Sequence, residues 1–179
     1  MDNQEYWANL IKDVEKWNRW RFYNSEVEID LSGMSFCSYN LEGINLSGCK
    51  LTETNFIGCN LRFANLSNTE LVKTNLIGAN LRMANLYKAI LINTLLMRSN
   101  LSEVNLNNSS IVECDFSGAI FHETELGEAV IIKSNFSNAK LINTHLIKAN
   151  LLLNNFENTL IKNVDFRWSK KIKNTVLIA

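Results

Sequence analysis

Large apolar side chains recur every five residues through most of the chain. From Leu31 to Phe166, all 28 positions at this spacing are Leu, Phe or Ile. Two residues before each of them, from Cys49 to Ala149, the 21 positions hold only Ala, Cys, Ser, Thr or Val. A spacing of five fits neither the helical period nor the alternation of a strand. The pattern predicts a solenoid, because one unit cannot bury its own apolar residue and stacked neighbours must do so.

The residue after each large apolar position shows how many units complete one coil. Read every ten residues, Val72, Arg82, Ile92, Ser102 and Val112 alternate between apolar and polar. The same environment therefore returns every 20 residues, which indicates four units per coil. The 28 units predict an all-β solenoid of about seven coils of four pentapeptides. With strand layers about 4.8 Å apart, the rod is about 34 Å long.

The units "ANLSN", "ANLRM" and "ANLYK" follow the motif A-[N/D]-L-x-x, and the sequence resembles the pentapeptide-repeat family. The resemblance covers residues 29 to about 168. It implies a right-handed quadrilateral β-helix with one unit on each side. An apolar residue replaces the polar one before the large position at Ile90, Leu95, Ile120, Val130 and Leu160.

Residues 1–28 are expected to form an N-terminal helical cap and the segment that leads into the first coil. Apolar side chains at steps of three and four predict one amphipathic helical face, which includes Arg21. Its apolar members are Trp7, Leu10, Val14 and Trp17. The block "WNRWR" resembles leaders seen ahead of other bacterial pentapeptide arrays. We expect the helix to cover the open end of the first coil, although clustered tryptophans also suit a base or a partner.

The β-helix is expected over residues 29–168, followed by a C-terminal tail over residues 169–179. Lys171 breaks the apolar spacing, and Leu153, Leu160 and Trp168 crowd the last coil. The family resemblance implies that a homodimer through the C-terminal end is possible. Alternatively, the tail adds a final strand and covers that end itself.

The bulk composition narrows the function. Lys plus Arg and Asp plus Glu both number 18, so the formal net charge is zero. This balance argues against direct nucleic-acid binding through phosphate contacts. The start of the chain lacks signal-peptide features, and no apolar run exceeds four residues. We therefore expect no membrane association and a cytoplasmic location.

No arrangement of residues suggests catalysis, a cofactor or a metal. The cysteines, Cys37, Cys49, Cys59 and Cys114, form no C-x-x-C pair. His122 and His145 are expected to be isolated outward residues, and there is no Gly-rich phosphate loop. The protein is not expected to be an enzyme. Asn residues at 20-residue spacing suggest amide ladders along the rod, and Glu–Lys pairs at the same spacing suggest surface ion pairs.

One feature points to a partner. Seven outward apolar residues fall on a single side, and we call them the apolar stripe: Val72, Ile90, Ile92, Val112, Val130, Ile132 and Leu152. Contiguous exposed apolar surface is typical of a contact site, for another protein or for a second copy. The alternative is that β-branched residues simply favour strand positions.

The resulting hypothesis is a non-catalytic interaction or scaffold module that presents a rigid β-helix face to a protein partner. The family resemblance supplies an alternative, a DNA mimic that binds and protects a type II topoisomerase, DNA gyrase. Such a mimic needs strong negative potential, and the zero net charge disfavours it.

Overall fold

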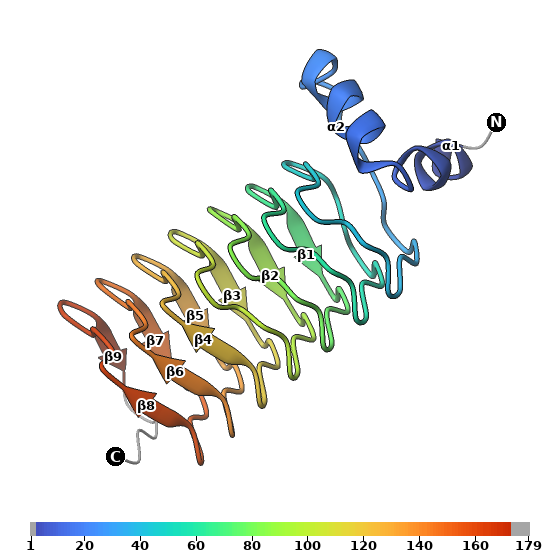
Figure 1. Ribbon diagram of the computed structural model, residues 1–179. Coiled ribbons are helices and arrows are strands. Elements are labelled where there is room, and N and C mark those ends of the chain that lie inside the picture. Colours follow the sequence, from blue (N-terminus) through green and yellow to red (C-terminus); the bar gives the residue numbers. More distant parts are fainter. Residues whose placement is uncertain (1–2, 173–179) are drawn as a thin grey trace.

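The five-residue pattern builds a straight rod of stacked coils. We analysed a computed structural model of the protein, in which residues 3–172 are described. Backbone bridges join residues 20 apart along four parallel rows, which begin at Asp30, Ser35, Asn40 and Asn45. Four units therefore complete one coil, and the chain forms a right-handed quadrilateral β-helix. Figure 1 shows the coils stacked from the N-terminal helices to the opposite end.

Regular strands occupy two opposite sides of this rod. The six-stranded face contains β1 (Glu70–Val72), β2 (Ile90–Ile92), β3 (Ser110–Val112), β5 (Val130–Ile132), β7 (Asn150–Leu152) and β9 (Lys170–Ile172), all parallel and in this order. The three-stranded face contains β4 (Ile120–His122), β6 (Lys140–Ile142) and β8 (Leu160–Lys162). The strands of the six-stranded face occupy six successive coils, one strand in each, and isolated bridges join the coils before Glu70. Fewer coils are regular than the seven expected.

Hydrogen bonds to asparagine side chains accompany most of the interruptions of the regular strands. The side-chain Oδ1 of Asn80 accepts a hydrogen bond from the backbone amide of Arg82 at 3.2 Å. Most Asn residues that directly precede a large apolar residue accept the backbone amide two residues further along in the same way. This local turn takes an amide that would otherwise join the ladder between coils. Four departures from the family motif are instead the first residues of regular strands: Ile90, Ile120, Val130 and Leu160. Amide-to-amide ladder bonds join only some Asn pairs, such as Asn60 to Asn40 at 2.8 Å.

The interior is filled by the large position of each unit, which is buried in every case from Leu31 to Phe156. Phe116, Phe136 and Phe156 stack in one column, with ring centroids 4.9 and 4.8 Å apart. The small position also forms hydrogen bonds, since the hydroxyl of Thr54 donates to the carbonyl of Leu31 at 2.9 Å. A buried hydroxyl needs such a partner, which explains why Thr recurs there.

The N-terminal segment forms two helices, α1 (Asn3–Leu10) and α2 (Val14–Tyr23), which meet at an angle in Figure 1. The expectation of one continuous helical face is therefore wrong. The break arises at Asp13, which has an extended backbone with φ −116° and a carboxylate that accepts the amide of Lys16 at 3.1 Å. An aspartate in this geometry is a favourable N-cap, so it starts a new helix.

Helix α2 covers the first coil by replacing the hydrogen bonds of a missing coil. The indole of the fully buried Trp17 donates to the carbonyl of Asn45 at 2.7 Å, and Arg21 donates to the carbonyl of Ser47 at 2.7 Å. Asn18 accepts the amide of Asn45 at 2.8 Å. One coil further on, the equivalent carbonyls accept backbone amides of the preceding coil. The α2 side chains thus satisfy an edge that would otherwise be open.

The remaining cap residues pack around Trp17. Trp7, Leu10 and Val14 are partly buried against the core, and Ile11 is fully buried. The rings of Trp7 and Trp17 meet edge to face, with centroids 6.0 Å apart. Within residues 3–172, neither helix is long and apolar enough to span a lipid bilayer.

Candidate protein-interaction face

The six-stranded face carries the main row of the apolar stripe in continuous register. Val72 pairs with Ile92, Ile92 with Val112, Val112 with Ile132, and Ile132 with Leu152. The central residue of each strand points inward and is buried, so these flanking side chains point outward and are partly exposed. Parallel strands hold neighbouring side chains of one row about 4.8 Å apart. The row is therefore a continuous apolar strip.

A second outward row runs beside the first. Ile90 and Val130 lie in it, with exposed fractions of 40 % and 37 %, and Ser110 lies between them. Glu70 precedes this row and Asn150 follows it. All seven residues of the apolar stripe thus lie on one face.

Opposite charges line one edge of this face, at the corner that follows each strand. Lys73 lies 3.2 Å from Glu53, and Lys133 lies 3.2 Å from Glu113, measured between the ammonium and carboxylate atoms. The side chains are 47 to 60 % exposed. We call the row Glu53, Lys73, Asn93, Glu113 and Lys133 the charged rim. Exposed pairs of this kind add little stability. The row nevertheless presents charges in a defined order along the edge.

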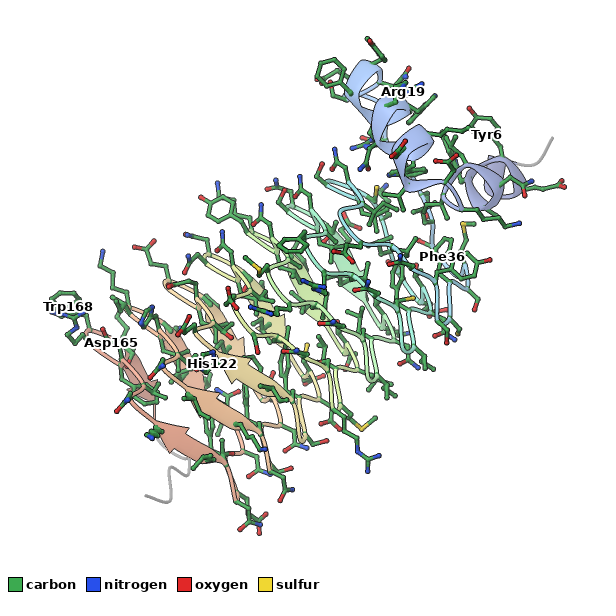
Figure 2. All side chains as sticks on the ribbon, in the orientation of Figure 1. Tyr6, Arg19, Phe36, His122, Asp165 and Trp168 are labelled. Carbon is green, nitrogen blue, oxygen red and sulfur yellow. The ribbon has the colours of Figure 1, made fainter. Side chains whose placement is uncertain are left out.

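The three residues expected to make a C-terminal contact lie at different positions around the rod. Leu153 occupies the corner after β7, Leu160 begins β8, and Trp168 occupies the corner before β9, with exposed fractions of 43 %, 50 % and 72 %. Trp168 extends from the end of the rod (Figure 2). Strand β9 continues the pairing into the predicted tail, and residues 173–179 of that tail lie outside the described residues.

Comparison with known proteins agrees with this architecture. The sequence profile of pentapeptide repeats (eight copies) matches residues 29–62, 40–76, 54–93, 99–138 and 134–170. The chain belongs to the pentapeptide-repeat family. Among curated protein sequences, none matches this pentapeptide-repeat protein significantly.

Solved structures of other pentapeptide-repeat proteins share its fold. HetL, involved in heterocyst differentiation regulation in the cyanobacterium Nostoc sp. strain PCC 7120, has 18 % sequence identity and a TM-score of 0.54; the match covers 85 % of this chain and 92 % of HetL. QnrB1, a plasmid-mediated fluoroquinolone resistance protein, has 22 % identity and a TM-score of 0.64, with 76 % of this chain and 67 % of that chain covered. At these identities, the likeness concerns the fold.

One polar cluster on the pentapeptide-repeat rod was not expected from the sequence. His145 is not isolated, since its Nδ1 lies 2.7 Å from Oε1 of Glu125, one coil earlier, and Asp165 follows one coil later. Hydrogen bonds from the Arg167 side chain hold the pKa of Asp165 below its ordinary value. The 20-residue spacing of these residues was the signal that could have revealed the row. Among residues 3–172, no three His, Cys, Asp or Glu side chains are placed to hold a metal.

Two smaller apolar groups also lie on the surface. Ile57, Ile77 and Met97 follow one another at 20-residue spacing on the side next to the six-stranded face. Phe63 and Met83 are neighbours at a corner and are 45 % and 41 % exposed. Both groups are shorter than the apolar stripe.

The cysteines offer no evident chemistry. Cys49, Cys59 and Cys114 are buried, and burial raises the pKa of each thiol to about 11. Cys37 is exposed and lies beside the hydroxyl of Ser35, 3.4 Å away. In the part of the chain that the structure describes, no pocket opens on the surface or inside the rod.

Proposed function

We propose that this pentapeptide-repeat protein is a non-catalytic interaction module that binds a protein partner with its six-stranded face. The observation that carries the proposal is the main row of the apolar stripe, five outward apolar side chains in adjacent register. Apolar surface of this kind gains about 25 cal/mol per Å² when a partner covers it.

The backbone beneath the stripe favours binding for a second reason. β2, β3, β5 and β7 are each paired with a strand on both sides, and the side chains at the centre of β1 to β7 are buried. A surface that is already ordered loses little conformational entropy when it binds. The face is therefore suited to hold a partner without rearrangement.

Strand propensity alone does not account for the apolar stripe. The three-stranded face has the same backbone geometry, yet its outward positions include His122, Lys140 and Lys162. Its apolar outward residues are Ile120, Ile142 and Leu160. Ile120 and Leu160 share one row but are separated by Lys140, and Ile142 lies in the other row. Polar side chains thus serve these strands equally well, which supports a separate reason for the apolar row.

A DNA mimic that protects a type II topoisomerase is less well supported. Such a protein needs a continuous negative surface, whereas Arg62 and Arg82 stack on the three-stranded side of this rod. Arg82 pairs with Glu103 at 2.7 Å, and Arg62 lies 3.9 Å from Glu42. Charges of both signs are distributed along the rod, in keeping with the balanced composition. The likeness to QnrB1 supports a shared fold only.

Affinity capture with matched variants tests the proposal. The wild-type protein, Ile92→Lys/Ile132→Lys and a control, Ile142→Lys/Ile147→Lys, would be immobilised and exposed to lysate of the source cells. The control places the same changes at equivalent outward positions on two other sides of the rod. Circular dichroism would establish that all three are folded.

A protein retained by the wild type and the control, but lost from Ile92→Lys/Ile132→Lys, would support the six-stranded face as the binding surface. Equal retention by all three would contradict it, and the apolar stripe would then reflect strand composition.

A further inference from the structure

We propose that the six-stranded face binds a second copy of this chain, packed face to face and antiparallel around a two-fold axis at Ile92. The inference rests on the proposed function, since it uses the same face, and it names the partner. The argument comes from the order of charges on the charged rim and from the side chains that this order brings together.

The charged rim is self-complementary when its direction is reversed. Along the rod it reads negative, positive, neutral, negative, positive, from Glu53 to Lys133. Consider a two-fold axis that is parallel to the strands and passes through Asn93. The second rod then runs in the opposite direction, and each row of side chains faces the same row of the second copy. Glu53 then faces Lys133 of the second copy, and Lys73 faces its Glu113. Each of these two contacts occurs twice, so four opposite-charge pairs form.

The same axis brings apolar side chains together. Ile92 meets Ile92 of the second copy, Ile90 meets Ile90, and Val72 meets Val112. The other three residues of the apolar stripe, Val130, Ile132 and Leu152, lie opposite Lys50, Thr52 and Ser32 at the ends of the contact. Two β-sheets pack with their faces about 10 Å apart, a distance that outward side chains from both sides fill. The exposed Lys and Glu side chains of the rim are long enough to meet across this gap.

Neighbouring registers place like charges opposite each other. A shift of one coil in one direction puts Glu53 opposite Glu113, and a shift in the other puts Lys73 opposite Lys133. Like charges opposed at an interface repel each other and disfavour the contact, so the rim selects against both registers. The other edge of the face is the corner that precedes each strand, where Lys88 and Glu128 lie. A parallel arrangement sets the charged rim against this other edge. It then offers a single opposite-charge pair, Lys133 with Glu128.

The other edge does not oppose the antiparallel register. Lys88 is the residue of that edge that lies nearest the axis. Its ammonium lies 5.3 Å from the ring centroid of Tyr87, which belongs to the adjacent side of the rod. The charge is therefore directed away from the six-stranded face. Two-fold dimers with the same patch on both subunits are the most common closed assemblies.

Two charge reversals test both the partner and the register. Lys73→Glu alone places two carboxylates opposite each other at both copies of the contact with Glu113, and Glu113→Lys alone places two ammonium groups there. An equimolar mixture of the two variants restores both opposite-charge contacts in the mixed dimer. Sedimentation velocity over a concentration series would measure self-association of the wild type, each variant, the mixture and a control, Lys140→Glu on the three-stranded face.

We expect self-association by the wild type and the control, a loss of about tenfold or more in each single variant, and recovery in the mixture. Recovery also excludes misfolding as the cause, since the mixture contains only the two variants. A wild type that stays monomeric would overturn the inference. Association that both variants retain would also overturn it, and would favour contact through the C-terminal end.

The two proposals fail separately. If the wild type is monomeric but captures another protein through the apolar stripe, the inference falls and the proposed function stands. If neither self-association nor capture depends on the stripe, both fall.

Discussion

The substitution Trp17→Phe tests whether the cap acts through hydrogen bonds to the first coil. It keeps an aromatic ring in the buried site but removes the indole N–H that donates to Asn45 at 2.7 Å. Leaving a partly buried carbonyl without its donor costs about 1–3 kcal/mol. The smaller ring adds less than about 1 kcal/mol, at roughly 24 cal/mol per Å³ of unfilled volume. We expect a total loss of about 1–4 kcal/mol, which corresponds to about 5- to 700-fold in an opening equilibrium.

Because a solenoid opens from its ends, native-state hydrogen exchange is the appropriate assay. The amides of Leu46 and Gly48, which donate to the second coil, should lose protection by that factor. The amide of Leu146, near the other end of the rod, should not change. The matched control is Trp20→Phe. Trp20 belongs to the same aromatic cluster, 4.9 Å from Trp7, but among residues 3–172 no acceptor is found for its indole N–H.

In the control, the protection of the same amides should fall by less than about fivefold, because the substitution removes only partly buried surface. An equal loss of protection in both variants would refute the reasoning, since packing alone would then explain the cap.

Three further outcomes follow from the structure. Phe136→Leu removes two stacking contacts, worth about 0.5–1.5 kcal/mol each, and should lower the free energy of unfolding by about 1–3 kcal/mol in urea titrations; no change would show that the column packs equally well with leucine. A thiol reagent at pH 8 should modify only Cys37 in the folded protein and all four cysteines in denaturant, since burial raises the pKa of the other three to about 11. Arg167→Gln should raise the pKa of Asp165 towards its ordinary value in a carboxyl NMR titration. In the wild type, Asp165 has a lowered pKa and stabilises the fold above its unfolded pKa, and this contribution is lost as pH falls through the folded value.

Sequence periodicity predicted the architecture because every unit obeys one rule. An unbroken series of large apolar residues and a strict small position leave one way to bury both, and the alternation of Val72, Arg82 and Ile92 set four units per coil. The same arithmetic placed the apolar stripe, whose residues all lie on one face. Its role in binding stays a prediction.

Features that depend on local hydrogen bonds were harder to predict. Helical periodicity is continuous through Asp13, but its carboxylate caps α2 and breaks the segment in two. Asparagine suggested ladders along the rod, whereas its Oδ1 mostly accepts an amide two residues on. His145 was judged by its neighbours in sequence, although its partner Glu125 lies one coil away.

The fold separates two kinds of information in this sequence. Inward positions are set by the repeat and are nearly the same on all four sides, so these residues give no information about a partner. Outward positions share one backbone geometry and are free of that constraint, which makes the sides internal controls for one another. On this comparison the six-stranded face differs, since its five consecutive apolar residues, Val72 to Leu152, exceed the three of Ile57 to Met97 on the next side. Regular strands also run through this face, and Ile90 and Val130 begin two of them where asparagine would form a local turn. These two residues therefore add to both the apolar character and the regularity of the face, and both effects favour a partner that is itself a β-sheet.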